Sequence, residues 1–487
     1  MSISQEMAND QNPELPLCVD LDGTLVNTDT LFESAVLLAK ANPLYIFAML
    51  FWFFSGKAHL KANLKEQIAS RIKMDVGALP YNQPLLEWLR EQRAMGRNLV
   101  LVTAANYRIA AAVADHLQLF SEVIASTSQR NMSAANKRDE LVRQFGAKGY
   151  DYIGNSRDDL KVWTSCRNAI LVNASPMLAA RAAKRAGIEA SFPNPYRPWQ
   201  ALIRAMRPYQ WSKNLLVFVS ILIAQNYANI PLLYATILAF ISFCLCSSAV
   251  YLINDLLDLE ADRRHTEKCH RPFASGQIPL TYGILVTPVL LAMSAFLAWR
   301  AGGVFLGVLA LYFGVTLAYS FYLKRLALLD VLILALLYTL RIVAGAAVAS
   351  ATPSVWLISF SMFFFTSLAM AKRYAELKSV ELDSIEPVRG RGYVVSDIAI
   401  IAQLGAASGY ISVLVLALYI DSHDVIATYH QQGFMWLLCP LLMYWIGRIW
   451  LVASRGQLHQ DPVIFATRDR VSYIVFGLGL LTIMAAR

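Results

Sequence analysis

Charge is scarce in this sequence. Charged residues make up 16% of its 487 residues and hydrophobic residues 56%, whereas a soluble domain usually carries about 25% charged residues. The shortage is uneven, because residues 1–200 carry charges throughout and long apolar runs alternate with short charged loops from about residue 213 onward. This composition excludes a single soluble domain. It predicts a soluble N-terminal part followed by a membrane domain.

Two further signals are missing. The cysteines show no spacing typical of a metal site, and residues 1–16 lack the basic start and apolar core of a signal peptide. We therefore expect free thiols, on the reducing side of a membrane or within it, and no cleaved signal. The six cysteines are Cys18, Cys166, Cys244, Cys246, Cys269 and Cys439.

Lysine and arginine are missing from alternate loops of the apolar part. Loops 225–231, 350–353 and 420–432 have neither residue, and Arg300 stands alone in its loop, whereas the loops between them are basic. Basic loops face the cytoplasm. We predict a multi-pass inner (cytoplasmic) membrane protein with a cytoplasmic N-terminal domain that binds no nucleic acid, and the sequence leaves a homo-oligomer open. The nine expected spans are 214–230, 232–254, 281–299, 302–322, 328–349, 354–372, 396–419, 433–453 and 470–486.

The soluble part alternates strand and helix patterns. Apolar runs such as LPLCVDLDG, NLVLVTAAN and NAILVNAS are separated by helical stretches, which predicts an α/β, Rossmann-like fold with a parallel sheet. Segment 28–82 is too long for a simple crossover, so we expect a helical cap there. Its apolar stretch 44–55 is either a buried cap helix or an interfacial helix that rests on the membrane.

A pair of carboxylates follows the first expected strand. In VDLDGTLV, Asp20 and Asp22 stand two positions apart and therefore on one side of the chain. Paired carboxylates can hold Mg²⁺, and one can attack phosphorus while the other transfers a proton. This stretch resembles the first motif of the haloacid dehalogenase-like phosphohydrolases. The resemblance implies Asp20 as nucleophile, Asp22 as general acid/base, both as metal ligands, and Gly23 and Thr24 as substrate-binding residues.

The resemblance continues over roughly residues 14–195 and implies a phosphatase domain at 1–198 with a haloacid dehalogenase fold. Thr103 matches the second motif, and Lys137 matches the phosphate-binding lysine. The fourth motif, GNSRDD, has Asn155 where the family usually has aspartate. Its amide oxygen can still bind Mg²⁺, with the charge supplied by Asp158 or Asp159. A weaker metal site or an inactive regulatory domain are the alternatives to an active phosphatase.

Acidic residues also continue directly from an apolar run of the membrane part. In NDLLDLEAD, Asp255, Asp258 and Asp262 recur at i, i+3 and i+7 and share one face of a helix. Three carboxylates on one face repel one another unless cations lie between them. The spacing predicts a Mg²⁺–diphosphate site that includes Asn254; a solvated charged loop is the alternative.

This stretch resembles the first Asp-rich motif, NDxxDxxxD, of the UbiA superfamily of intramembrane prenyltransferases. The resemblance covers about 200–487 and implies an all-α membrane domain at 199–487, with Asp255, Asp258 and Asp262 in catalysis. The second Asp-rich motif of that family is depleted here. YSFYLKRLALLDVL keeps Tyr319 and Lys324 but only one acid, Asp330, which argues against an ordinary prenyl diphosphate donor.

Further segments, among them RPYQWSKNLLVF, AKRYAEL and DPVIFATRDR, resemble the decaprenyl-phosphate phosphoribosyltransferase branch. That branch implies phosphoribosyl pyrophosphate as donor and polyprenyl phosphate as acceptor. Arg341, within an apolar run, either contacts a phosphate or pairs with a structural carboxylate. The expected substrate-binding residues of the membrane part are Lys213, Asn214, Asn254, Arg263, Lys268, Arg271, Tyr319, Lys324, Asp330, Arg341, Lys372 and Arg373.

The fusion of the two parts predicts consecutive reactions. The transferase would join ribose 5-phosphate to the lipid phosphate with Mg²⁺, and the phosphatase, also with Mg²⁺, would remove the 5-phosphate. The alternative is a prenyltransferase that moves a prenyl group to an aromatic acceptor, with a regulatory or unrelated phosphatase domain. A non-catalytic membrane scaffold or transporter is a third hypothesis, from a different functional class.

Overall fold

The computed structural model describes residues 15–42, 44–45, 48–49, 51, 74–127, 130–383, 392–422, 431–458 and 461–486. These form two compact units. One contains residues up to Met206 together with Leu252–Val286, and the other contains Arg207–Tyr251 and Thr287–Arg487. The predicted domain boundary at 198 stays a prediction. Of the predicted cap, residues 43, 46–47, 50 and 52–73 lie outside the described residues, so both interpretations of 44–55 remain open.

The first unit is built on a parallel sheet, as the sequence predicts. Its strand order is β3-β2-β1-β4-β5-β6, and every pairing is parallel. The central strand β1 lies between β2 and β4, so the chain that leaves β1 emerges at the carboxyl edge, where such sheets bind ligands. The strands are β1 (Leu17–Val19), β2 (Leu99–Asn106), β3 (Glu122–Ser126), β4 (Asp151–Gly154), β5 (Asn168–Val172) and β6 (Gly187–Phe192).

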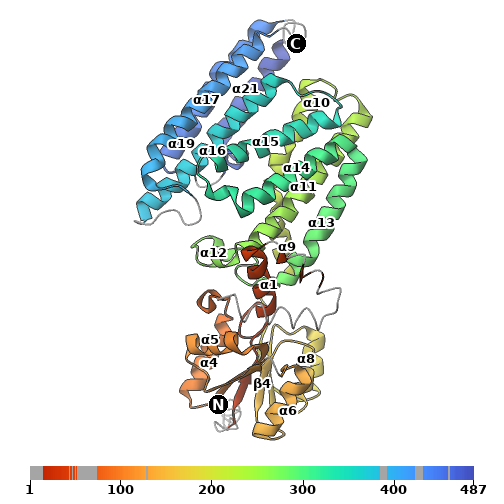
Figure 1. Cartoon of the computed structure of the whole chain (residues 1–487), viewed down its shortest axis with the longest axis vertical. Coiled ribbons are helices and arrows are strands. Elements are labelled where there is room, and N and C mark those ends of the chain that lie inside the picture. Colours follow the sequence, from red (N-terminus) through yellow and green to blue (C-terminus); the bar gives the residue numbers. More distant parts are fainter. Residues whose placement is uncertain are drawn as a thin grey trace, which may run out of the picture. The chain divides into compact units, whose positions relative to one another are not determined.

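Helices cover both faces of this sheet because successive strand side chains point to opposite faces. Leu17 and Val19 pack in one apolar core, and Cys18 packs in the other. Figure 1 shows α4 and α5 on one side and α6 and α8 on the other. The helices of this region are α1 (Thr30–Ala41), η1 (Val76–Ala78), α4 (Gln83–Ala94), α5 (Tyr107–Leu117), α6 (Ala134–Phe145), α7 (Leu160–Trp163), α8 (Pro176–Ala183) and α9 (Pro198–Met206).

The segment Leu252–Val286 packs with the soluble part, which the sequence did not predict. It includes the last turn of α11 (Ile230–Leu257), α12 (Leu259–Arg263), η3 (Lys268–His270) and the start of α13 (Leu280–Ala301). Gly276 has a positive φ of 72°, and a Cβ there would lie 2.6 Å from Asn27 Cβ. Glycine is therefore required where this loop meets the segment after the first motif.

The second unit is helical. Within the residues that the structure describes, seven helices are long and apolar enough to cross a membrane, which confirms seven of the nine predicted spans. They are Ile230–Leu257, Leu280–Ala301, Gly303–Phe321, Leu329–Val348, Val355–Ser379, Val395–Ile420 and Gln432–Ser454. The other two predicted spans are not confirmed. Segment 214–230 is broken by polar Gln225, Asn226 and Asn229, and Arg470–Ala486 is a shorter apolar helix.

The helices of this unit pack side by side, α15 against α14 and α16, and α19 against α17 and α21 (Figure 1). The segment η2 packs on α15 because Gly345 has no side chain: a Cβ there would overlap the carbonyl of Val217. The elements are η2 (Pro208–Phe218), α10 (Val219–Ile223), α14 (Gly303–Phe321), η4 (Leu323–Arg325), α15 (Leu329–Val348), α16 (Val355–Asp383), η5 (Val395–Asp397), α17 (Ile398–Ile420), η6 (Gln432–Leu437), α19 (Leu438–Ser454), α20 (Pro462–Ala466) and α21 (Arg470–Ala486).

Candidate active sites

The first site lies at the carboxyl end of β1. Asp20 follows this strand and is 8% exposed. Lys137, on α6, donates from Nζ to Asp20 Oδ1 at 2.8 Å and to the hydroxyl of Tyr152 at 3.0 Å. Thr103 is fully buried in β2, two positions after the residue that pairs with Val19. The structure thus brings together the predicted nucleophile and the predicted phosphate-binding lysine.

The fourth motif closes the same site. Tyr152 donates from its hydroxyl to Asp159 Oδ1 at 2.9 Å, and Asp159 Oδ2 accepts from the backbone N–H of Asn155 at 3.1 Å. A Cβ on Gly23 would overlap the Asn155 side chain, so the first and fourth motifs touch at a glycine. Asp158 is exposed, whereas Asp159 is buried and organises the loop. Tyr152 was not predicted, because an apolar strand gives no sign of a functional tyrosine.

Burial sets the protonation behaviour of the two carboxyl groups after β1. It raises the pKa of Asp22 to about 7, although the N–H of Thr30 donates to Asp22 Oδ1 at 2.8 Å. Burial also raises the pKa of Asp20, to about 6, against the opposing charge of Lys137. Burial alone would lower the pKa of Lys137, but Asp20 raises it above its ordinary value. A carboxyl group with a pKa near neutrality suits proton transfer.

The Asp motif of the second predicted site continues helically across a junction. Asp258 donates its N–H to the carbonyl of Asn254 at 2.9 Å, and Asp262 donates to the carbonyl of Asp258 at 2.8 Å, so the helical hydrogen bonds continue from α11 into α12. Arg271 Nη1 lies 2.6 Å from Asp262 Oδ2 and 3.3 Å from Asp255 Oδ1. Asp255 and Asp262 are thus brought together, with a guanidinium between them.

Magnesium at either site stays a prediction. Among the described residues, no three His, Cys, Asp or Glu side chains form a group that could hold a metal ion. The donor chemistry does fit a hard cation, since the motifs supply carboxylate and amide oxygens. Two buried oxygens, Asn254 Oδ1 at the Asp motif and Thr24 Oγ1 beside the first motif, have no hydrogen-bond partner. Buried polar atoms are normally paired, so these atoms are available to a ligand.

The predicted substrate-binding residue Arg263 has protein partners instead. Its Nη2 and Nη1 donate to Glu33 at 2.5 and 3.2 Å, and its Nε donates to the carbonyl of Ala274 at 2.9 Å. Glu33 lies on α1 and was not predicted. Nearby, Arg264 pairs with Asp75, and Lys268 begins η3. These hydrogen bonds give no support to the prediction that Arg263 binds a phosphate.

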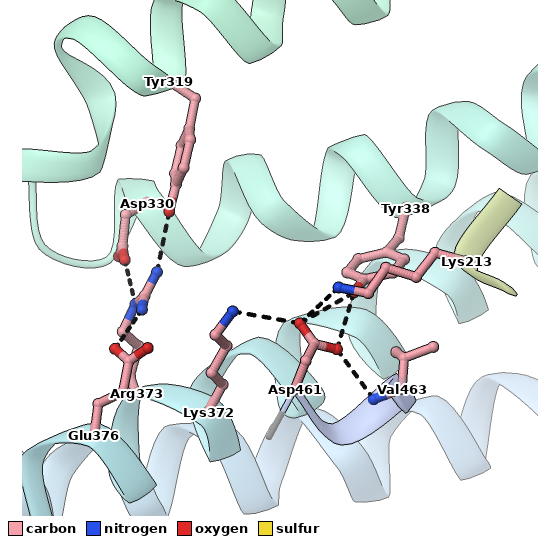
Figure 2. A network of polar contacts seen from close by, with 9 residues as sticks. All are labelled: Lys213, Tyr319, Asp330, Tyr338, Lys372, Arg373, Glu376, Asp461 and Val463. Atoms are coloured by element: carbon pink, nitrogen blue, oxygen red, sulfur yellow. Dashed lines mark hydrogen bonds and ion pairs between the residues drawn. The ribbon is translucent and has the colours of Figure 1, made fainter. Parts of the chain in front are cut away.

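In the second unit, the carboxylate of Asp461, which was not among the predicted site residues, contacts two lysines (Figure 2). Asp461 Oδ2 lies 2.9 Å from Lys213 Nζ and 3.4 Å from Lys372 Nζ, and Oδ1 accepts from the Tyr338 hydroxyl at 3.2 Å. Asp461 also caps α20 through the N–H of Val463. The sequence signals for Asp461 were its place before a proline at a helix start and its position in the segment DPVIFATRDR, which resembles the phosphoribosyltransferase branch.

Asp461 and Lys213 form a charged pair. Burial alone would raise the pKa of Asp461, but the charges of Lys213 and Lys372 lower it below its ordinary value. Burial alone would likewise lower the pKa of Lys213, and Asp461 raises it. Both groups are therefore ionised near neutral pH.

Arg341 is a buried cation with neutral partners. It is 5% exposed, and it donates to Asn214 Oδ1 and to the Tyr312 hydroxyl, each at 2.9 Å, and to the carbonyl of Leu337. Its guanidinium also lies over the ring of Tyr338, 5.5 Å from the centroid, as does Lys213 Nζ. Among the described residues no carboxylate pairs with it, so the structural ion pair considered from the sequence is not found.

We name Lys213, Arg341, Lys372 and Asp461 the Asp461 cluster. Among the described residues of this cluster, Lys213 and Lys372 share the carboxylate of Asp461, and Arg341 joins them through the ring of Tyr338. By contrast, Arg373 is fully matched: Nε donates to Asp330 Oδ2 at 2.6 Å, Nη1 to Glu376 Oε2 at 2.5 Å and Nη2 to the Tyr319 hydroxyl at 3.0 Å (Figure 2).

Asp330 also accepts from the hydroxyl of Tyr393 at 2.5 Å. The single acid of the depleted second motif is therefore part of a buried ion pair. The remaining predicted residue of this motif, Lys324, lies in η4.

Comparison with known proteins finds similarity to both predicted families. The UbiA prenyltransferase family model matches residues 215–468, and the haloacid dehalogenase-like hydrolase model matches residues 17–163. The protein y4nM of Sinorhizobium fredii is 35% identical over 468 residues, covering 96% of this chain and 90% of that protein.

The decaprenyl-phosphate phosphoribosyltransferase of Mycolicibacterium smegmatis is 32% identical over 293 residues, covering 58% of this chain and 92% of that protein. Among solved structures, a UbiA homologue from Archaeoglobus fulgidus bound to GPP and Mg²⁺ matches with a TM-score of 0.44 and 18% identity, covering 58% of this chain and 99% of that one.

Proposed function

Because the chain belongs to the UbiA prenyltransferase family and carries a haloacid dehalogenase-like domain, we propose that it is a bifunctional membrane enzyme. The transferase moves a 5-phosphoribosyl group from phosphoribosyl pyrophosphate to a polyprenyl phosphate, and the phosphatase then removes the 5-phosphate. The similarity to a protein named decaprenyl-phosphate phosphoribosyltransferase supports this donor and acceptor. We place the protein in the inner membrane, with the phosphatase in the cytoplasm where a soluble sugar donor is available.

The observation that carries the proposal is the excess of positive charge in the Asp461 cluster. Arg341 is buried and contacts no carboxylate in the described part of the chain, and Lys213 and Lys372 share Asp461. Unpaired buried cations are costly in a membrane protein and mark functional sites. A phosphate monoester carries about −1.5 to −2 charges at pH 7, so the head group of a polyprenyl phosphate would balance the cluster.

Buried aromatic side chains adjoin this cluster. The ring of Tyr338 stacks on Phe365 with centroids 4.6 Å apart, and the aromatic contacts continue through Phe364 to Trp445. A lipid phosphate needs a charged site for its head next to an apolar environment for its chain. This juxtaposition supports an acceptor of the polyprenyl phosphate class.

The donor would bind at the Asp motif. Asn254, Asp255, Asp258 and Asp262 would hold Mg²⁺, which when bound would neutralise charge on the pyrophosphate of the donor. Arg271 keeps Asp255 and Asp262 together. An oxygen of the acceptor phosphate attacks C1 of the ribose, and the bond from C1 to pyrophosphate breaks with its electron pair, so no proton transfer or redox partner is needed.

The state of Asp330 weighs against a prenyl diphosphate donor. Arg373 and Tyr393 occupy both oxygens of this only acid of the second motif. A carboxylate held in a buried ion pair is a poor metal ligand, because the metal would have to displace the arginine and leave it unpaired. The donor phosphates would then depend on the first Asp motif alone.

The phosphatase step uses Asp20 and Asp22. An oxygen of Asp20 attacks the phosphorus, the ester bond to O5 of the ribose breaks, and Asp22 donates a proton to that oxygen. Water then attacks the aspartyl phosphate, Asp22 takes up a proton, and inorganic phosphate leaves. Lys137, 2.8 Å from Asp20, would bind the phosphoryl oxygens. The pKa of Asp22, raised by burial to about 7, supports its role.

Lipid analysis tests both steps. Purified protein in bilayer discs is incubated with phosphoribosyl pyrophosphate, Mg²⁺ and a polyprenyl phosphate, and the lipids are resolved by mass. We expect polyprenyl-phosphoryl ribose from the wild type, its 5-phosphate from Asp20→Asn and no ribosylated lipid from Asp255→Ala. Turnover of a prenyl diphosphate with an aromatic acceptor, and none with the ribosyl donor, would instead establish the prenyltransferase alternative.

A further inference from the structure

The carboxylate of Glu33 belongs to the phosphatase domain but faces the loop that carries the Asp motif. Glu33 lies in the first turn of α1 and is 3% exposed. Both of its oxygens accept hydrogen bonds from Arg263, at 2.5 and 3.2 Å, and the Arg263 side chain is only 6% exposed. A buried, bidentate arginine–carboxylate pair fixes both position and orientation. Neither of the proposed reactions uses it.

Arg263 connects this pair to the Asp motif. It follows Asp262 directly in α12, and its Nε holds the carbonyl of Ala274 on the returning arm of the loop. That arm begins with Arg271, which binds Asp262 and Asp255. Anchoring Arg263 therefore fixes the direction of α12 and, through it, the separation of the motif carboxylates.

A second anchor lies on the other arm of the loop. Gly276 sits against Asn27, three positions after Thr24 of the first motif, and the next residue, Gln277, accepts from Arg204 at 2.7 Å. Glu33 is itself held by the hydroxyl of Thr28 at 2.7 Å. Both arms of the loop thus rest on the segment that follows the phosphatase DxD motif.

We propose that Glu33 is a positioning residue for the transferase: the phosphatase domain, through the Glu33–Arg263 pair, holds the Asp motif in the conformation that binds the donor. The domain thereby has a second role, as a scaffold, that does not depend on phosphate hydrolysis. The inference rests on the proposed function for the identity of the donor. The contact itself does not depend on that identity.

Variants of the full-length protein separate the scaffold role from hydrolysis. Glu33→Gln leaves the Arg263 charge buried and unpaired, and Glu33→Gln/Arg263→Gln removes both charges. Asp20→Asn disables hydrolysis but keeps the pair, and Glu87→Gln replaces an exposed glutamate of α4 as the matched control. Each variant is assayed for KM and kcat of the transfer and, independently of activity, for amide hydrogen exchange of residues 259–278.

We expect Glu33→Gln to raise the donor KM about tenfold, as loss of a supporting partner typically does, with an unchanged acceptor KM and faster exchange at 259–278. The double variant should regain thermal stability but not donor affinity. Glu87→Gln should transfer like the wild type, and Asp20→Asn should keep wild-type exchange at residues 259–278 because the Glu33–Arg263 pair is intact. Unchanged exchange and donor KM in Glu33→Gln would overturn the inference. Faster exchange throughout the chain would also overturn it, because the pair would then only support folding.

The outcomes distinguish this inference from the proposed function. Failure of the wild type with phosphoribosyl pyrophosphate refutes the proposed donor, and the exchange of residues 259–278 in Glu33→Gln still decides the scaffold role. The KM comparison is then made with prenyl diphosphate as donor.

Discussion

Lys213 and Asp461 are 248 positions apart in the sequence, and Lys213 Nζ donates a 2.9 Å hydrogen bond to Asp461 Oδ2. This pair joins η2 to the start of α20 and places Lys213 beside Tyr338, over whose ring Arg341 also lies. The cations of the cluster therefore come from three separate segments of the chain. Arg341 of this cluster and Arg373, which lies outside it, are both buried, and we predict different effects of replacing them.

Arg341→Met should retain the fold and lose the transfer reaction. The substitution removes a buried charge whose partners among the described residues are all neutral. We therefore expect a thermal unfolding temperature equal to or above that of the wild type, since functional charges are often kept at the expense of stability. Transfer to polyprenyl phosphate should fall about 100-fold, as on loss of one positioned donor. Differential scanning fluorimetry and the lipid assay measure the two effects. Wild-type transfer would show that Arg341 does not hold the acceptor phosphate.

Arg373→Met should destabilise the fold, in contrast to Arg341→Met, and it serves as a matched comparison. Arg373 is paired with Asp330, which is fully buried, so its removal leaves an uncompensated carboxylate. Breaking a buried pair in this way destabilises proteins by about 3–5 kcal/mol. We expect a clear drop in the unfolding temperature, measured in the same detergent. A variant as stable as the wild type would mean that Asp330 finds another partner.

Lys137→Met should stop the pathway after transfer. Lys137 contacts Asp20 at 2.8 Å and is placed to bind the phosphoryl group. We expect dephosphorylation to fall about 100-fold, the magnitude typical for one electrostatic donor, while the transfer rate is unchanged. The 5-phosphoribosyl lipid should accumulate in the mass spectrum. Exposed Lys184→Met, on the same domain, is the control and should yield the dephosphorylated lipid.

Gly276→Ala should weaken the loop that carries the Asp motif. A left-handed backbone costs an alanine about 1–2 kcal/mol, and the new Cβ would also meet Asn27 at 2.6 Å. Gly456→Ala is a matched control, since its φ is 71° but nothing lies within 4 Å of the new Cβ. We expect a larger loss of stability in Gly276→Ala, with a raised donor KM. Equal effects of the two substitutions would show that only backbone strain matters at Gly276.

Much of this protein was readable from local pattern. The parallel sheet follows from short apolar strands, and Asp20 lies at its functional edge because the carboxyl ends of parallel strands meet there. Lys137 lies in α6, and only the family resemblance indicated that it belongs beside Asp20. Seven spans follow from hydropathy, since a membrane helix satisfies its hydrogen bonds within one continuous segment. The unconfirmed span 214–230 had the weaker hydropathy signal, because Gln225 and Asn226 interrupt its apolar residues.

Tertiary structure alone decided the partners of the charges. The sequence determined that Arg263, Arg341 and Arg373 stand in or beside apolar runs, but their spacing could not say which of them is matched by a carboxylate. One pairs with Glu33, one with Asp330 and Glu376, and one with neutral groups only. Periodicity reports neighbours within one helix, such as Arg373 and Glu376. The contacts of these arginines with Glu33, Asp330 and Asn214 instead join segments far apart in the chain. The folded chain thus decides which buried cation remains available for a phosphate.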